Sequence, residues 1–417
     1  MFIRRDGGSL REEYTRRIEG LIPPMLSMQR SSWEQGVASQ ALLECYAFDP
    51  SSAPHLLNYI FGLVHDAAVR QGSDGRLSVL LNGDGKSDAG ALDPACIGET
   101  FFYVLNLPEG HSNRLTVETA NRITTSVERM LDYILRDCPR KTVDLPRYTS
   151  TEPLLSHRTD AVQIWSDSIY MLSPFLASAA VYYSTRANEK YDPLQLARMS
   201  CEQILIAAKV LQSESGVWSH IYDLDTHAFR RQALWGVGNG WVCAGIVRVL
   251  RTFAAAVGGH EHTGFAQNLS HTDIREAIAG CHRILTSTLT GCLRHIRDDG
   301  LFHDIVDDPT SFVETNLSQQ LAYAIYRLLC LHSDMSDEMH SILGLVPLSD
   351  DLKKEWFTVA EKMRAATKQK TDQWGFVRNV CGSPRFDSAG TAAEGQAFGV
   401  LMEVARTEYL LSISQQQ

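Results

Sequence analysis

The sequence predicts an all-α protein folded as an (α/α)6 barrel, a closed ring of six helical hairpins. Three observations support this prediction: helical periodicity recurs along nearly the whole chain, charged and apolar helices alternate, and glycine-containing turns follow the charged helices. A chain of 417 residues suggests two or three domains by length alone, but barrels form longer single domains. We therefore expect one barrel domain over residues 1–417, with loose termini at 1–10 and 412–417.

Twelve helices are predicted from the spacing of apolar residues. No series of alternating strands competes with them, although short extended segments are expected in the loops. The predicted helices cover residues 11–28, 33–48, 54–70, 92–106, 117–137, 163–186, 191–212, 236–256, 273–290, 313–331, 351–368 and 391–411.

The predicted helices alternate between two compositions. Val117–Asp137 and Asp351–Lys368 are amphipathic with many charges, which suits an outer layer in contact with water. Ala161–Tyr183, Gly236–Val257 and Thr391–Leu410 are rich in alanine, glycine and apolar residues, which suits a tightly packed inner layer. Twelve such helices make six hairpins, and their simplest closed arrangement is the barrel. An open helical solenoid is the alternative, but it would need a more regular repeat.

Composition limits the classes of partner and the cellular compartment. The chain has 39 basic and 49 acidic residues, a net charge of -10, and no basic stripe that would bind nucleic acid or an anionic membrane. Neither a signal segment nor a membrane-spanning segment is expected, so we predict a cytoplasmic protein. Nine cysteines without a Cys-x-x-Cys pair are expected to be reduced core residues rather than zinc ligands or disulfides.

Asp167 is the first candidate for a functional residue. It is the single carboxylate in the apolar run from Gln163 to Ala177, and a charge there is costly unless it is paired, hydrogen-bonded or used. Asp93 begins another inner helix, where the alternative role is to cap the free amides. If the two acids share a pocket, one should stay protonated near neutral pH and act as a general acid.

Four connections from outer to inner helices share a glycine beside an apolar or aromatic residue, which predicts a tight turn and a short extended segment. They are Asp74-Gly-Arg-Leu77, Ser215-Gly-Val-Trp-Ser-His220, Asp299-Gly-Leu-Phe-His303 and Asp372-Gln-Trp-Gly-Phe376. In a barrel these loops gather on one rim, where binding sites are usually built. His157 and His303 lie on loops of this rim and are candidates for substrate contact.

The densest aromatic cluster spans Gly216-Val-Trp-Ser-His-Ile-Tyr-Asp223 and Trp235-Gly-Val-Gly-Asn-Gly-Trp241. These aromatic residues could form core, or flat walls for a sugar ring or another flat ligand. The three glycines of the second block indicate that something approaches the backbone closely. Motifs for nucleotide binding, zinc proteases and serine hydrolases are missing from the sequence.

These blocks, together with His157-Arg-Thr-Asp160 and Gln163-Ile-Trp-Ser-Asp167, resemble the unsaturated rhamnogalacturonyl and glucuronyl hydrolases of glycoside hydrolase families 105 and 88, the six-hairpin glycosidases. Asp307-Asp-Pro-Thr-Ser-Phe-Val-Glu-Thr315 and Glu394-Gly-Gln-Ala-Phe398 extend the likeness, which begins near Trp33. The resemblance implies a metal-independent and cofactor-free reaction. A water molecule adds across the 4,5 double bond of an unsaturated uronyl residue, which is then released from a small oligosaccharide.

The resemblance also implies roles for individual residues. Asp167 is expected to protonate the double bond and help water add, and Asp93 is expected to assist it. Trp165, His220 and Trp241 match residues that line the sugar pocket of the family. Our full set of expected substrate-binding residues adds Trp33, His157, Trp235, Val237, Asn239 and His303. We expect a small-molecule substrate, no nucleic-acid or membrane partner, and a monomer or homodimer.

Val237 departs from the family pattern, because members that act on unsaturated rhamnogalacturonan commonly carry arginine there. The missing cation removes a contact worth roughly 1.5–3 kcal/mol, which Arg158, Arg230 or Arg231 could replace. An alternative function is therefore a lyase, isomerase or cyclase that uses the same acid on an apolar small molecule of secondary metabolism. A binding module without catalytic activity is a third hypothesis.

Overall fold

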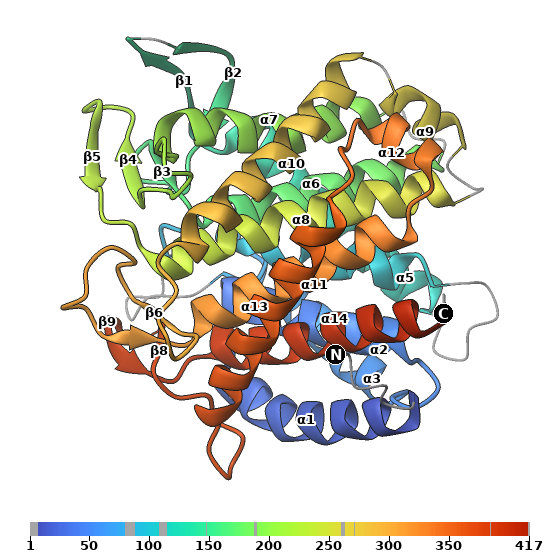
Figure 1. Cartoon of the computed structure of the whole chain (residues 1–417). Helices are drawn as coiled ribbons and strands as arrows, with labels where there is room; N and C mark the ends of the chain where they lie inside the picture. The colour runs from blue at the N-terminus through green and yellow to red at the C-terminus, as the bar shows by residue number, and fades with distance from the viewer. Residues whose placement is uncertain are drawn as a thin grey trace.

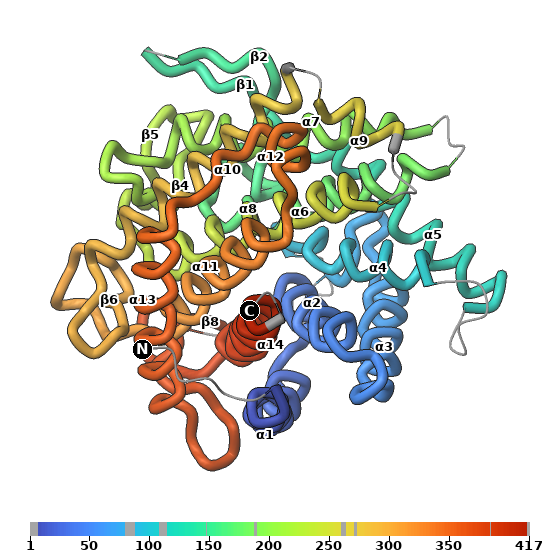
Figure 2. Tube along the Cα trace, turned by 45° about the vertical axis from the view of Figure 1, so that its right-hand side comes forward, coloured from blue at the N-terminus to red at the C-terminus, as the bar shows by residue number. Residues whose placement is uncertain are grey.

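The computed structural model confirms a helical barrel built from two concentric layers (Figures 1 and 2). The outer helices are α1 (Gly7–Met28), α3 (Leu56–Val69), α5 (Val117–Asp132), α7 (Pro193–Leu211), α10 (Thr272–Leu293) and α13 (Asp350–Gln369). The inner helices are α2 (Ser32–Phe48), α4 (Gly98–Leu105), α6 (Ser168–Ser184), α8 (Gly236–Gly258), α11 (Asn316–Asp334) and α14 (Ala393–Gln415). The structure describes residues 7–79, 88–107, 115–146, 148–186, 190–259, 263–270, 272–383 and 385–415.

The inner helices form a closed ring. Each of them packs against the next in the order α2, α4, α6, α8, α11 and α14, and α14 returns to pack against α2. Each outer helix after the first covers the inner helix that precedes it, and α1 covers α14, so the first and last hairpins join (Figure 2). This closure contradicts the open solenoid and leaves one hydrophobic core between and within the layers.

Burial follows the two compositions. Every residue of α11 from Asn316 to His332 is buried, whereas α5 buries a single stripe spaced three or four residues apart, such as Ile123, Val127 and Met130. Helix α8 is long and apolar enough to cross a membrane by length and composition, contrary to the expectation. However, 78% of its most apolar window is buried inside the fold, as in the core helix of a globular protein.

Short strands lie in the connections, as expected. Strands β3 (Gln163–Trp165), β4 (Ile221–Asp223) and β5 (Ala228–Arg231) form one antiparallel sheet. The others pair as β6 (Phe302–His303) with β7 (Val313–Glu314), β8 (Val380–Gly382) with β9 (Arg385–Gly390), and β1 (Arg140–Leu145) with β2 (Tyr148–Leu155), a hairpin that the sequence did not predict. The four predicted turn glycines, Gly75, Gly216, Gly300 and Gly375, all have φ between 83° and 99°, which favours glycine.

Several predicted boundaries are wrong. Residues 163–165 pair with β4, which satisfies their backbone groups, so α6 begins only at Ser168. The helix predicted at 92–106 starts with a 3-10 turn, η1 (Asp93–Ile97), and the helix predicted at 313–331 starts at Asn316. The remaining short helices are the π-helical η2 (Tyr133–Asp137), α9 (Thr263–Leu269) and α12 (Asp337–Leu343).

The expected loose termini are in part helical. Helix α1 already includes residues 7–10, and Leu10 is buried against the fold. Helix α14 includes residues 412–415, and Ile413 packs against the hydrophobic core. The remainder of the two predicted loose segments, residues 1–6 and 416–417, lies outside the described residues. All nine cysteines are buried, in agreement with their prediction as core residues.

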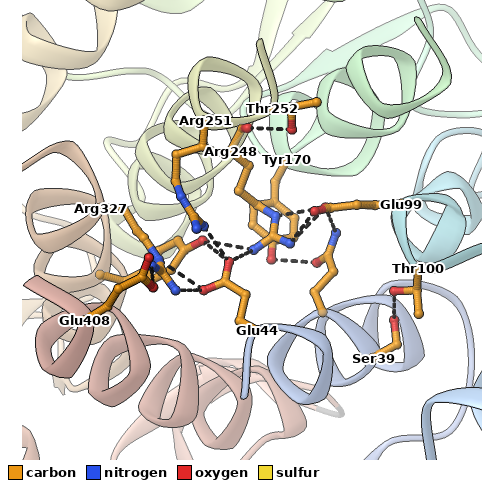
Figure 3. A network of polar contacts seen from close by, with 12 residues as sticks. Ser39, Glu44, Glu99, Thr100, Tyr170, Arg248, Arg251, Thr252, Arg327 and Glu408 are labelled. Carbon is orange, nitrogen blue, oxygen red and sulfur yellow. Dashed lines mark hydrogen bonds and ion pairs between the residues drawn. The ribbon is translucent and has the colours of Figure 1, made fainter. Parts of the chain in front are cut away.

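A buried network of charged residues lies at the centre of the ring (Figure 3). Glu44 of α2 contacts Arg248 at 2.7 Å and Arg251 at 3.2 Å, both on α8, and also pairs with Arg327 of α11. The network continues through Gln40, Glu99, Tyr170, Tyr323 and Glu408. Its members come from all six inner helices, so it connects the whole ring.

Candidate active site

The first residues of the inner helices surround a cavity of about 700 Å³. Trp33 lies at the start of α2, Asp93 begins η1 ahead of α4, Asp167 precedes α6, Val237 lies in the first turn of α8, and Glu394 lies in the first turn of α14. The inner helices run in the same direction, so their amino-terminal ends meet at one rim. The prediction that Asp93 and Asp167 share a pocket is therefore confirmed.

Asp93 pairs with His157 at the side of the cavity. Asp93 Oδ1 lies 3.3 Å from His157 Nε2, while His157 Nδ1 lies 3.0 Å from the Ser168 hydroxyl. Burial opposes the charged form of His157, but the carboxylates of Asp93 and Asp167 outweigh burial and raise its pKa to about 8. His157 is therefore an imidazolium at neutral pH, held between two acids.

Asp167 is 9% exposed and has a perturbed proton affinity. Burial raises the pKa of Asp167 to about 6; the His157 imidazolium opposes this rise and the Asp93 carboxylate adds to it. Asp167 therefore holds its proton in weakly acidic solution and is mostly ionised at pH 7; the shift has the predicted direction, but it is smaller than protonation near neutral pH requires. A carboxyl group that holds a proton in weakly acidic solution meets the requirement of a general acid.

His220 faces Asp167 as a neutral imidazole. Burial lowers the pKa of His220 well below its usual value, and the nearby cations Arg231 and His157 lower it further. The Arg231 guanidinium donates to His220 Nδ1 at 3.1 Å, so the proton of the neutral ring lies on Nε2. His220 Nε2 lies 3.9 Å from Asp167 Oδ1, and neither atom has a hydrogen-bond partner within the described part of the chain.

These two unpartnered atoms identify the reactive part of the cavity. Buried polar atoms are nearly always hydrogen-bonded in folded proteins, because leaving one unpaired costs about 1–3 kcal/mol. A donor at His220 Nε2 and a carboxyl oxygen at Asp167 Oδ1 can both bind one oxygen atom of a ligand or of an attacking water. The arrangement therefore combines a protonatable acid with a fixed hydrogen-bond donor.

Aromatic rings form a continuous wall beside the two acids. The ring of His157 stacks on Trp165 at 4.6 Å, Trp165 meets His220 edge-on at 5.4 Å, and His220 lies 4.4 Å from Trp235. Trp165 Nε1 donates to Gln163 Oε1 at 3.1 Å, which fixes the indole. Trp241 completes the wall from α8. Such flat surfaces suit a sugar ring or another flat ligand.

Two predicted substrate-binding residues do not line the cavity. Asn239 is fully buried, and its amide binds the backbone N–H and C=O of Trp218 at 2.7 and 3.0 Å, so it holds the loop before β4. His303 binds the Ser311 carbonyl oxygen and Arg297, both at 2.9 Å, outside the cavity. All other predicted site residues line it.

The glycines of the second aromatic block make room for the protein itself rather than for a ligand. A Cβ at Gly238 would lie 2.7 Å from the ring of Trp235, and one at Gly236 would lie 2.9 Å from Leu317. The close approach predicted from these glycines is correct, but the neighbouring atoms belong to the same chain. Trp218, in the first aromatic block, is likewise fully buried core.

Other cavity residues were not predicted from sequence as catalytic or substrate-binding, although Arg158 and Arg231 were candidates to replace the missing cation. These other residues are Asp88, Ala89, Gly90, Arg158, Asp160, Met171, Ile221, Arg231, Cys381, Phe386 and Glu394. Burial and the Asp93 carboxylate raise the pKa of Asp88 to about 6. Phe386 lies on the β8–β9 hairpin, and no local pattern around it signals a site. Glu394 belongs to the recognised block at 394–398, which could have identified it.

Among the residues that the structure describes, no group of three or more histidine, cysteine, aspartate or glutamate side chains could hold a metal ion.

Comparisons with known proteins agree with this architecture. The model of glycosyl hydrolase family 88 matches residues 11–329. A search of curated proteins found no match.

Solved structures with the same fold include a possible member of family GH105 from Klebsiella pneumoniae. It has a TM-score of 0.68 and 16% identity, and the match covers 99% of this chain and 95% of that chain. A family 88 glycosyl hydrolase from Bacteroides vulgatus has a TM-score of 0.62 and 13% identity, covering 95% and 99%. The unsaturated glucuronyl hydrolase from Bacillus sp. GL1 has a TM-score of 0.57 and 12% identity, covering 93% and 94%.

Proposed function

The chain belongs to glycosyl hydrolase family 88, and on this premise we propose that it removes a 4,5-unsaturated uronyl residue from the non-reducing end of a small oligosaccharide. The observation that carries the proposal is the pair of unpartnered atoms, Asp167 Oδ1 and His220 Nε2, which lie 3.9 Å apart beside the cavity. Asp167 supplies the proton, and His220 positions an oxygen atom.

The first step is protonation of the double bond. The protonated Asp167 carboxyl gives its proton to C4, and the C4=C5 electron pair forms the new C–H bond. Positive charge then develops on C5 and the ring oxygen, next to the Asp167 carboxylate that the step has created. The step creates two opposite charges from neutral groups, so it is favoured by their close contact and by the His157 imidazolium, which stabilises the Asp167 carboxylate.

The second step is addition of water at C5. A water molecule attacks C5 and returns one proton to Asp167, while the Nε2–H of His220 can hold its oxygen. The product is a hemiketal, whose C5–O bond to the ring oxygen breaks to give a ketone at C5. The hemiacetal left at C1 then releases the leaving sugar as an alcohol. Asp167 ends the cycle protonated, so no cofactor is consumed.

Arg231 is proposed to bind the substrate carboxylate in place of the arginine that Val237 replaces. It lines the cavity, reaches His220 at 3.1 Å, and forms no ion pair with the described residues. Arg158 also lines the cavity, but both of its terminal contacts, at 2.7 Å, go to Asp160. Arg230 is not among the lining residues. The uronyl carboxylate is attached to C5, the carbon atom that lies next to His220 in the proposed mechanism. A cation beside His220 can therefore reach this carboxylate.

The apolar side of the cavity motivates a second candidate function. Val237, Met171 and Trp241 line the cavity together and could hold an apolar alkene or enol ether. Under this alternative, Asp167 protonates a small molecule of secondary metabolism in a lyase, isomerase or cyclase reaction. The position of Arg231 favours the uronyl substrate.

The proposal is tested by incubating the protein with unsaturated uronyl disaccharides and following loss of the double-bond absorbance. We expect turnover by the wild type, a loss of about 10²–10⁴-fold in Asp167→Asn, and a roughly 10–100-fold rise in KM in Arg231→Gln, which loses a charge-assisted contact. Arg230→Gln is the matched control outside the cavity and should behave as the wild type. A folded wild type that turns over none of these disaccharides would reject the proposal.

A further inference from the structure

A glutamate enters the cavity from the side opposite Asp167. Glu394 lies in the first turn of α14, is 2% exposed and lines the cavity. In the ring order α2, α4, α6, α8, α11, α14, helices α6 and α14 are three positions apart, so they stand across the ring from each other (Figure 2). The mechanism proposed above uses Asp167 and leaves Glu394 without a role.

Glu394 is held at one oxygen and left open at the other. Its Oε1 accepts a hydrogen bond from Trp33 Nε1 at 2.8 Å, whereas its Oε2 is buried without a partner among the described residues. Arg30 cannot neutralise it, because Arg30 forms two bonds to Glu34, of 2.9 and 2.6 Å. Burial, aided by the charge of Glu34, raises the pKa of Glu394 to about 7. The carboxyl group can therefore donate as well as accept.

Trp33, the hydrogen-bond partner of Glu394, lies next to the exposed Phe386 at the edge of the cavity. Phe386 lies 6.5 Å from Trp33 and 6.5 Å from Trp235, and is 39% exposed. Phe386 also borders an adjoining open hollow, together with Arg231 and Arg385 of strands β5 and β9. A substrate with its reactive ring at Asp167 and His220 would leave the cavity past Phe386, so its next unit would pass Glu394.

We propose that Glu394 is a specificity-determining residue that hydrogen-bonds a hydroxyl group of the leaving sugar, with Trp33 holding the carboxyl in place. This inference rests on the proposed function, because it takes the uronyl residue to lie at Asp167. On this proposal, the side of the cavity that faces Asp167 binds a polyhydroxylated sugar ring rather than an apolar leaving group. Gly382 contributes space, because a Cβ there would lie 3.1 Å from Glu394 Oε2.

The test compares two substrates that differ only in the leaving group, an unsaturated uronyl disaccharide and the methyl glycoside of the same unsaturated acid. We compare kcat/KM for the disaccharide divided by kcat/KM for the methyl glycoside. Glu394→Leu should lower this ratio by about tenfold, mainly by raising KM for the disaccharide, because a buried hydroxyl of the leaving sugar loses its partner. Glu394→Gln keeps the shape of the side chain and can both donate and accept a hydrogen bond, so it should retain most of the wild-type ratio. A melting temperature within a few degrees of the wild type shows that each variant is folded.

Equal losses on the two substrates would overturn the inference, because a merely structural role affects both alike. Wild type that turns over neither substrate would instead reject the proposed function. In that case calorimetry in the Asp167→Asn background still decides the inference. The inference is supported if Glu394→Leu weakens binding of the disaccharide more than binding of the methyl glycoside. It is overturned if both are weakened equally or if neither ligand binds.

Discussion

At the scale of single residues, the site depends on His157 and Asp167, whose pKa values are shifted by each other and by the Asp93 carboxylate. Asp93 holds the His157 imidazolium at 3.3 Å, and this cation lowers the pKa of Asp167 against the effect of burial. The result is an acid with a pKa of about 6. Without the imidazolium, Asp167 would hold its proton more tightly and would release it to a carbon atom less readily.

The pH dependence of activity should follow this balance. Because Asp167 must carry a proton, kcat/KM for an unsaturated disaccharide should fall as the pH rises above about 6. Replacing His157 with glutamine removes a cation that lowers the pKa of Asp167, and leaves the Asp93 carboxylate that raises it. Loss of the cation therefore raises the pKa of Asp167, and the alkaline limb of the profile should move to higher pH. A limb that stays in place or moves to lower pH would contradict the assignment of Asp167.

At the scale of elements, small residues let the inner helices pack closely enough to bring their first turns to one cavity. Gly245 of α8 lies against the backbone of α6, where an added Cβ would be 2.8 Å from the Cα of Tyr170. Tyr170 is in turn fixed by Trp241, whose ring lies 4.6 Å away. The distance between α6 and α8 therefore sets the distance between Asp167 and the wall that α8 provides.

Two glycine substitutions should have opposite effects on stability. Gly245→Ala meets backbone atoms, which cannot rotate away, and should destabilise the fold by about 1–3 kcal/mol. Gly62→Ala lies on an exposed position of α3 with no atom within 4 Å of the new Cβ, and should stabilise it by about 0.5–1 kcal/mol through helix propensity. Urea denaturation measures both. Equal effects from the two substitutions would contradict close packing of α6 on α8.

At the scale of the whole molecule, the ring is closed by residues that are far apart in sequence. Glu44 near the end of α2 binds arginines of α8 and α11, more than two hundred residues away (Figure 3). Arg248 lies seven residues beyond Trp241, the last residue of α8 that lines the cavity, which is about 10 Å along the helix at 1.5 Å per residue. Burial would raise the pKa of Glu44, but Arg327, Arg248 and Arg251 outweigh it and lower the pKa to about 2. Glu44 therefore stays ionised at the centre of the fold.

Removing this charge should weaken the whole barrel. Glu44→Gln removes the anion that Arg248, Arg251 and Arg327 share, while Arg248 keeps Glu99 and Arg327 keeps Glu408. It should lower the free energy of unfolding by about 3 kcal/mol, the lower end for loss of one partner from a buried ion pair. Arg198→Gln breaks an ion pair with Asp273 in which both side chains are about half exposed, and should cost less than about 1 kcal/mol. Denaturant unfolding at neutral pH checks both values. A Glu44→Gln loss as small as that of Arg198→Gln would show that the network does not stabilise the ring.

The native contribution of Glu44 also has a defined pH range. Its pKa is lower in the folded state than the usual value of 4.5, so the folded state binds its proton less readily than the unfolded chain. The stabilisation is complete above the unfolded pKa and is lost as the pH falls toward 2. The difference in stability between wild type and Glu44→Gln should therefore narrow in acid.

The sequence by itself determined the twelve main helices and their two layers, and it singled out Asp93 and Asp167 as acids that could share one pocket. Periodicity is a local property of the chain, and the order of the motifs around Trp165 and Trp235 identified the family. Only the tertiary structure decided that Arg231 and Glu394 line the cavity while Asn239 does not. The burial, partners and proton affinity of these side chains depend on residues that come into contact only when the ring closes. Local sequence patterns do not predict such contacts.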